Sequence, residues 1–83
     1  MPNWDDDFEA ALREVIPPDN HSLINPDVKL VDIGLDSMGV MQLVTLLEDS
    51  YDIVFPIEYV NPDVMATPSS LWSVVTAVRT GAG

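Results

Sequence analysis

The segment DSMGVMQLVTLLEDSY, residues 36–51, has the strongest periodic pattern in this 83-residue sequence. Its apolar residues recur at the i, i+3, i+4, i+7 and i+11 positions of one helical face: Val40, Leu43, Val44, Leu47 and Tyr51. We therefore predict an amphipathic helix over residues 37–51 that buries this face in a core. Met38 and Met41 form a second apolar strip beside it. Polar residues continue this strip toward the end of the helix: Thr45, Glu48 and Asp49.

Two further segments have helical spacing. In the first, five apolar residues lie on one face: Trp4, Phe8, Leu12, Val15 and Ile16. The acids at residues 5–7 stand in its first turn, where they complement the helix dipole, and the helix should end at Pro17. In the last segment Thr67-Pro68 is typical of a helix start, and four apolar residues follow on one face: Leu71, Val74, Val75 and Val78. We expect this last helix to end near Gly81.

A long connection joins the first two helices. It contains too many apolar residues for a free linker, so we expect it to pack against the helices: Leu23, Ile24, Val28, Leu30 and Ile33. Farther along the chain, Asn61-Pro62 predicts an N-cap and one short helix through Met65. The predicted fold is therefore all-α, a small bundle of three main helices plus one short helix. We expect a single domain over residues 1–83 with a helical core at about 4–80.

The charge balance is strongly acidic. There are 14 Asp and Glu residues against 3 Lys and Arg, which gives a formal net charge of −11. No basic residue lies between Lys29 and Arg79. Nucleic acid is a poor partner for such a chain, because phosphate contacts need Lys and Arg, whereas proteins with basic docking patches fit it. The charge alone is equally compatible with acids that only keep a small protein in solution.

Several classes of protein are disfavoured by composition. No apolar run is long enough to span a bilayer, and the amino-terminal segment MPNWDDDFEA has acids where a signal peptide would be positive. We therefore expect a cytoplasmic monomer without a membrane partner. No metal site is expected, because the acids at residues 5–7 are consecutive, whereas the ligands of a calcium loop alternate. There is no cysteine, so any thiol must come from a bound group.

Ser37 stands at the start of the predicted helix, where either it or Asp36 could cap the first turn. A hydrolase nucleophile would need the pattern G-x-S-x-G, but Leu35 occupies the first glycine position, and the base could only be His21. Catalysis is therefore disfavoured. A cap does not explain Gly39, which costs about 1 kcal/mol relative to alanine inside a helix. Glycine there indicates a close approach to the backbone, and the helix amides at this end would favour a phosphate attached to the serine.

The run DIGLDSMGVMQLVTLLEDSYDI, residues 32–53, resembles the modification site and second helix of the acyl carrier protein and peptidyl carrier protein family. Members have Asp-Ser followed by Leu or Met after a D-x-G-x element, and five residues match here: Asp32, Gly34, Asp36, Ser37 and Met38. The resemblance extends to the order of the helices over most of the chain. It implies that Ser37, flanked by Asp36, carries 4'-phosphopantetheine, which a separate phosphopantetheinyl transferase takes from coenzyme A. The thiol of this arm would hold an acyl or aminoacyl group as a thioester, and the protein would not itself be an enzyme.

The resemblance also gives a use to the second strip of the helix. Met38 and Met41 would provide adaptable apolar contact, while Glu48 and Asp49 would meet basic residues of partner enzymes. These partners would be the transferase, an acyl- or aminoacyl-loading enzyme, and a downstream synthase or acyltransferase. Structural alternatives stay open, with Met41 at the periphery of the core and Glu48 as a solvated helix residue.

Two features bear on the pathway. Asp36 before the serine fits acyl carriers better than the Gly-Gly-x-Ser pattern of many peptidyl carriers. The segment FPIEYVNPDVMATPSSLW, residues 55–72, has only Glu58 and Asp63 as acids, unlike the acid-rich carriers of fatty-acid synthesis. We therefore expect a free-standing carrier in polyketide, nonribosomal peptide or related natural-product biosynthesis. The alternative is an unmodified acidic helical adaptor that binds partners through the same face.

Overall fold

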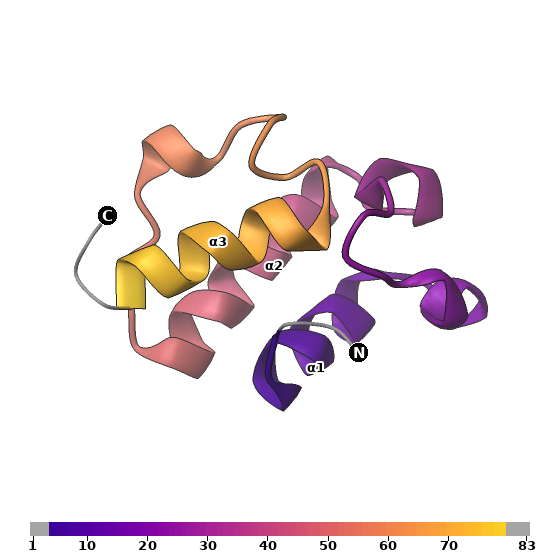
Figure 1. Ribbon diagram of the computed structural model, residues 1–83, viewed down its shortest axis with the longest axis horizontal. Helices are drawn as coiled ribbons and strands as arrows, with labels where there is room; N and C mark the ends of the chain where they lie inside the picture. The colour runs from indigo at the N-terminus through magenta and orange to yellow at the C-terminus, as the bar shows by residue number, and fades with distance from the viewer. Residues whose placement is uncertain (1–3, 80–83) are drawn as a thin grey trace.

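The computed structural model describes residues 4–79, which form three α-helices joined by short 3₁₀ helices (Figure 1). The α-helices are α1 Asp6–Val15, α2 Ser37–Tyr51 and α3 Pro68–Arg79, and the 3₁₀ helices are η1 Pro18–Leu23, η2 Leu30–Ile33 and η3 Ile57–Tyr59. The amino end of α1 meets the carboxyl ends of α2 and α3, so α1 runs opposite to the other two. The predicted all-α bundle is confirmed. No helix within residues 4–79 has the length and apolar character needed to cross a bilayer.

Helix α1 begins two residues later than its apolar spacing predicts. Asp5 is its N-cap and not part of its first turn. The Phe8 N–H donates to Asp5 Oδ1 at 3.1 Å, which satisfies one of the amides that the helix start leaves free. The helix ends at Val15 because Ile16 is extended ahead of Pro17, as the proline ring requires.

Helix α2 has the bounds that its apolar spacing predicts. Asp36 is the N-cap, and the Gly39 N–H donates to its Oδ1 at 2.8 Å. At the other end Asp52 adopts a left-handed conformation, with φ of 53°, and stops the helix. The predicted inner face is correct, since its central members are buried and its two outer members are half-buried: Leu43, Val44 and Leu47, then Val40 and Tyr51.

The long connection packs against the helices, as predicted. Its residues Leu30 and Ile33 are buried, whereas Leu23 is 50% exposed and does not join the core. Two backbone hydrogen bonds tie the connection to the segment around the start of α3: Leu30 N to Ala66 O at 2.9 Å, and Ser69 N to Pro26 O at 3.1 Å. The connection is thereby fixed beside the amino ends of α2 and α3.

The helix predicted over residues 61–65 is only a single turn. The predicted cap is present, because the Val64 N–H donates to Asn61 Oδ1 at 2.9 Å. The turn cannot continue because Thr67 caps α3 directly after it, with the Ser70 N–H donating to Thr67 Oγ1 at 3.1 Å. The short helical element between α2 and α3 is instead η3. The prediction that the last helix ends near Gly81 falls outside the described residues.

The core draws on all three α-helices and the long connection. Its fully buried apolar members include Phe8, Leu12, Ile16, Leu30, Leu43, Leu47, Leu71 and Val75. Near the carboxyl end of α2 the core is aromatic: the ring of Phe8 lies 5.3 Å from that of Trp4 and 5.0 Å from that of Trp72, between centroids. The core therefore packs against the middle and carboxyl end of α2. The amino end of α2 lies at the surface.

Candidate functional site

Ser37 is the first residue of α2, and its side chain is exposed. Its hydroxyl makes no hydrogen bond with other groups of residues 4–79. The first N–H groups of an α-helix have no partners within the helix, and they favour a negative group placed beyond them. A phosphate bonded to Ser37 Oγ would therefore lie where the helix stabilises its charge.

Two neighbours fix the backbone beneath Ser37. Leu35 is buried, and its N–H donates to Leu30 O at 3.0 Å. Its side chain fills the space under the first turn of α2. A Cβ on Gly39 would lie 2.9 Å from Leu35 Cδ1 and 3.3 Å from Asp36 Oδ1. The close approach indicated by Gly39 is thus made by the chain itself, and it holds Ser37 at the surface on a rigid turn.

An open groove of about 820 Å³ lies beside Ser37. Three separate parts of the chain line it, namely the long connection, the start of α2 and the turn before α3; their residues include Lys29, Val31, Ser37, Val40, Met65 and Ala66. Sequence reasoning missed Lys29, Met65 and Ala66 as site residues. No local pattern indicates them, because only the packing of the long connection against the turn brings them beside Ser37.

The residues predicted to dock partners lie along one side of α2. Met38 and Met41 are 83% and 58% exposed, and Asp49 is exposed as well. Neither methionine lines the groove. Glu48 is half-buried, and its Oε2 accepts a hydrogen bond from the Phe55 N–H at 2.9 Å. Glu48 thus anchors the connection that follows α2, whereas Asp49 is available to solvent.

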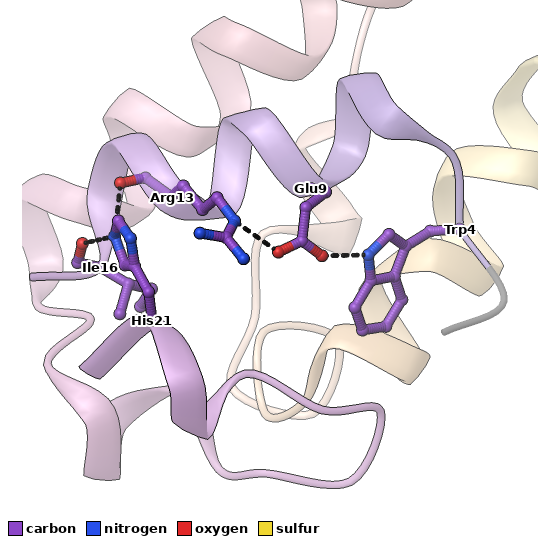
Figure 2. Close-up of polar contacts among 5 residues, drawn as sticks. All are labelled: Trp4, Glu9, Arg13, Ile16 and His21. Atoms are coloured by element: carbon purple, nitrogen blue, oxygen red, sulfur yellow. Dashed lines mark hydrogen bonds and ion pairs between the residues drawn. The ribbon is translucent and has the colours of Figure 1, made fainter. Parts of the chain in front are cut away.

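His21 has a structural role at the end of α1 (Figure 2). Its Nε2 lies 2.9 Å from Arg13 O and 2.8 Å from Ile16 O. Because carbonyl oxygens only accept, the Nε2–H must donate to both, and it satisfies carbonyls that the helix end leaves free. His21, which the sequence left as the one possible base for Ser37, is therefore a cap of α1. This role removes the base that a Ser37 hydrolase would need.

The geometry suits a serine that another protein modifies. The Ser37 hydroxyl is exposed and unbonded within residues 4–79, its backbone is fixed by Leu35 and Gly39, and the neighbouring groove is open to solvent. A bulky substituent on Ser37 Oγ could extend into solvent or along this open groove. The site therefore has the space that a phosphopantetheine arm on this residue requires.

Comparisons with known proteins agree with this geometry. Residues 3–66 match the family model described as the phosphopantetheine attachment site. The D-alanyl carrier protein of Bacillus subtilis is 38% identical over 77 residues, which cover 88% of this chain and 99% of that protein. The aminoacyl carrier protein 2 of Bradyrhizobium diazoefficiens is 38% identical over 55 residues, 65% of this chain and 62% of the relative. The D-alanyl carrier protein of Listeria monocytogenes is 33% identical over 69 residues, 82% of this chain and 88% of the relative.

Proposed function

This chain belongs to the phosphopantetheine-binding family of carrier proteins, and from that premise we propose that its arm is attached to Ser37 Oγ. Membership makes the protein a carrier and not an enzyme, with a covalently attached 4'-phosphopantetheine. When bound, this arm supplies the thiol that the sequence lacks, and that thiol holds a cargo as a thioester. The observation that carries the proposal is the exposed, unbonded hydroxyl of Ser37 at the amino end of α2.

In this modification Ser37 needs no base of its own. Its hydroxyl oxygen forms the new O–P bond to the pantetheine-side phosphorus of coenzyme A, the pyrophosphate bond breaks and adenosine 3',5'-bisphosphate leaves, and the hydroxyl proton passes to the transferase. The contribution of this chain is to present the oxygen on a fixed turn, which Leu35 and the Asp36 cap hold in place. The absence of a histidine beside Ser37, which counts against a hydrolase, is therefore no obstacle to modification.

We propose an aminoacyl group as the cargo. The relatives that support this choice are named D-alanyl carrier protein and aminoacyl carrier protein, and two of them are 38% identical to this chain. Of the pathways expected from the sequence, this cargo favours those that activate amino acids over polyketide assembly. The loading enzyme would then be one that forms an aminoacyl thioester on the arm.

The docking face we propose is the side of α2 defined by Met38, Met41, Glu48 and Asp49. Its exposed methionines give apolar contact that adapts to different partners, and Asp49 gives an exposed negative charge. This face starts next to Ser37 and does not overlap the groove. A partner with a basic patch could therefore bind α2 while the arm on Ser37 reaches the active site of that partner.

Intact-mass measurement tests the attachment site. The purified protein is incubated with coenzyme A and a broad-specificity phosphopantetheinyl transferase, and we expect a mass gain of one phosphopantetheine group. Ser37→Ala should abolish this gain, whereas Ser50→Ala, which alters another exposed serine of α2, should preserve it. If the wild type gains no mass, the chain is the unmodified acidic adaptor. A gain that survives Ser37→Ala would place the arm elsewhere.

Loading and docking need separate experiments. The modified protein is offered amino acids and simple carboxylic acids with candidate loading enzymes, and we expect thioesters of amino acids to form. With a loading enzyme that works, Asp49→Lys should slow loading several-fold, while the matched reversal Asp19→Lys in η1 should not. Equal loading of both variants would mean that α2 does not dock this enzyme. Loading by fatty or polyketide acids alone would overturn the proposed cargo.

A further inference from the structure

Lys29 is the one lysine of the sequence, and it stands beside the proposed attachment site. It is exposed and lines the same groove as Ser37. The other two cations are engaged elsewhere, Arg13 with Glu9 at 2.7 Å and Arg79 with Asp5 at 3.7 Å. Lys29 makes no such ion pair with any group of residues 4–79. Among residues 4–79 it is thus a cation without an ion-pair partner, although the formal net charge of the sequence is −11.

The backbone at Lys29 is well fixed. It is the residue directly before η2, and the next residue, Leu30, is fully buried. The Leu30 N–H donates to Ala66 O at 2.9 Å, which ties the long connection to the turn before α3. Lys29 therefore has a fixed starting point at the groove, while its long side chain stays free to reach a negative group there.

An arm on Ser37 would place a phosphodiester directly at this groove. The new negative charge would stand next to Asp36, another residue that lines the groove. Lys29 is the one cation among the residues that line it. Beyond the charged end, apolar side chains from both walls line the groove, among them Val31, Val40 and Met65. The positive charge of Lys29 and the apolar lining together suit an arm that starts with a phosphate and continues with less polar groups.

We propose that Lys29 is a positioning residue for the arm, whose ammonium group pairs with the phosphodiester on Ser37 and turns the arm over the groove. This inference rests on the proposed attachment to Ser37. This ion pair directs the arm along the groove when no partner is bound. The arm then points away from Met38 and Met41, which do not line the groove. The docking face of α2 is then uncovered when a partner arrives, and the arm leaves the groove when the partner displaces it.

The reactivity of the single lysine gives a direct test. Apo and modified protein, the latter with its arm thiol blocked by alkylation, are treated at low ionic strength with an N-hydroxysuccinimide ester of acetic acid. Mass spectrometry of the Lys29 peptide gives the acetylation rate, with the N-terminal amine of each sample as the internal reference. We expect Lys29 to react about threefold more slowly in the modified protein, the factor for two unit charges about 6 Å apart in water.

Ionic strength supplies the control for this protection. About 1 M salt reduces the screening length to about 3 Å, so the difference between the apo and modified forms should disappear. Equal rates at low salt would overturn the inference. Protection that persists unchanged at high salt would also overturn it, because this would mean simple steric cover by the arm.

Amide chemical shifts test the direction of the arm without any enzyme reaction. On modification, we expect shift changes at groove residues such as Val31, Val40 and Ala66. Lys29→Gln should remove most of these changes, and Lys29→Arg should retain them. Identical changes in Lys29→Gln, or changes concentrated at Met38 and Met41, would overturn the proposal. If no modified protein forms at all, the proposed function fails and the inference fails with it. If it forms with an unprotected Lys29, only the inference fails.

Discussion

The two ends of α2 are built in opposite ways. The open end, with Ser37, Met38 and the groove, has exposed side chains and one capping hydrogen bond. The closed end joins all three α-helices through packed rings and charged groups: Trp4, Asp5, Phe8, Tyr51, Trp72 and Arg79. If Ser37 is the attachment site, as proposed, the packed contacts of the fold and the functional residues lie at different ends of one helix. The side chains of the open end make few contacts within residues 4–79, whereas those of the closed end join the three α-helices.

At the closed end, Tyr51 is the central residue. Its hydroxyl donates to Asp5, the N-cap of α1, and its ring lies 6.2 Å from that of Trp72 in α3, between centroids. The Arg79 guanidinium lies 4.7 Å above the Tyr51 ring and 3.7 Å from Asp5 Oδ2. Burial and the hydrogen bond to Asp5 raise the pKa of Tyr51 well above its ordinary value. The hydroxyl therefore stays protonated and keeps donating at physiological pH.

The carboxyl groups at this end show the opposite shift. Burial alone would raise the pKa of Asp5, but hydrogen bonds from Tyr51 and the Phe8 N–H, together with the charge of Arg79, hold it below its ordinary value. Burial would likewise raise the pKa of Glu9, but its bonds with Trp4 and Arg13 outweigh burial and lower it. Figure 2 shows Glu9 between these two side chains. Its carboxylate oxygens accept from Trp4 Nε1–H at 2.8 Å and from Arg13 Nε–H at 2.7 Å.

The largest difference between the two ends should appear with Phe8→Ala. Phe8 is fully buried between two tryptophans, so its truncation should lower the free energy of unfolding by about 3–5 kcal/mol. Met38→Ala at the open end should change it by less than about 0.5 kcal/mol, because that side chain is 83% exposed. Urea denaturation followed by circular dichroism measures both. Similar losses in the two variants would contradict the contrast between the ends.

Gly34→Ala should reveal how rigid the backbone is at the open end. Gly34 lines the groove with φ of 111°, and a Cβ there would lie 2.7 Å from Pro17 Cδ. The strained backbone and this clash should lower the free energy of unfolding by about 2 kcal/mol. Urea denaturation measures the loss, with Ala10→Gly, an exposed site in α1, as the comparison for an ordinary Ala–Gly difference. If Gly34→Ala lowers the free energy of unfolding no more than Ala10→Gly does, the connection between α1 and α2 must move to accommodate the new Cβ.

Tyr51→Phe should weaken the closed end while leaving its ring packing in place. The ring contacts with Trp72 and Arg79 remain, and only the hydrogen bond to Asp5 is lost. We expect a loss of about 0.5–1 kcal/mol, because both partners are partly exposed to solvent. The pKa of Asp5 should rise in this variant, which an NMR titration of its carboxyl carbon would detect. An unchanged Asp5 titration would mean that the hydrogen bond does not form in solution.

The smallest effect should be the dependence of stability on pH. Asp5 and Glu9 have lowered pKa values, so their contribution is present above the ordinary carboxyl pKa and is lost as pH falls through the lowered values. Tyr51 has a raised pKa, so its contribution is present below the ordinary tyrosine pKa and is lost as pH rises above it. The stability difference between wild type and Tyr51→Phe should therefore be greatest near neutral pH. A constant difference across a pH series of denaturation curves would contradict this assignment.

Much of the fold was predictable because its signals are local. The bounds of α2 follow from the spacing of its apolar residues, with Asp36 before them as a cap, and all of these lie within one segment. The prediction over residues 61–65 failed as a helix although its cap was correct, because the next cap, Thr67, begins α3 too soon. At this segment the cap residue indicated where a helical turn starts, but not how far it continues.

The candidate site likewise contains residues that a local sequence pattern indicates and residues that only the packing of distant segments places there. Ser37 and Asp36 are proposed as site residues from the sequence alone, because a helix start and its motif are contiguous. The cap formed by His21 on α1, the groove position of Lys29 and the link from Asp5 to Tyr51 and Arg79 were decided only by the tertiary structure. Each of these depends on segments that are distant in the sequence, and their approach is set by how the core buries its apolar surface. Local spacing determines where a helix can form and which face it buries, but the neighbours of an exposed side chain depend on the packing of the whole chain.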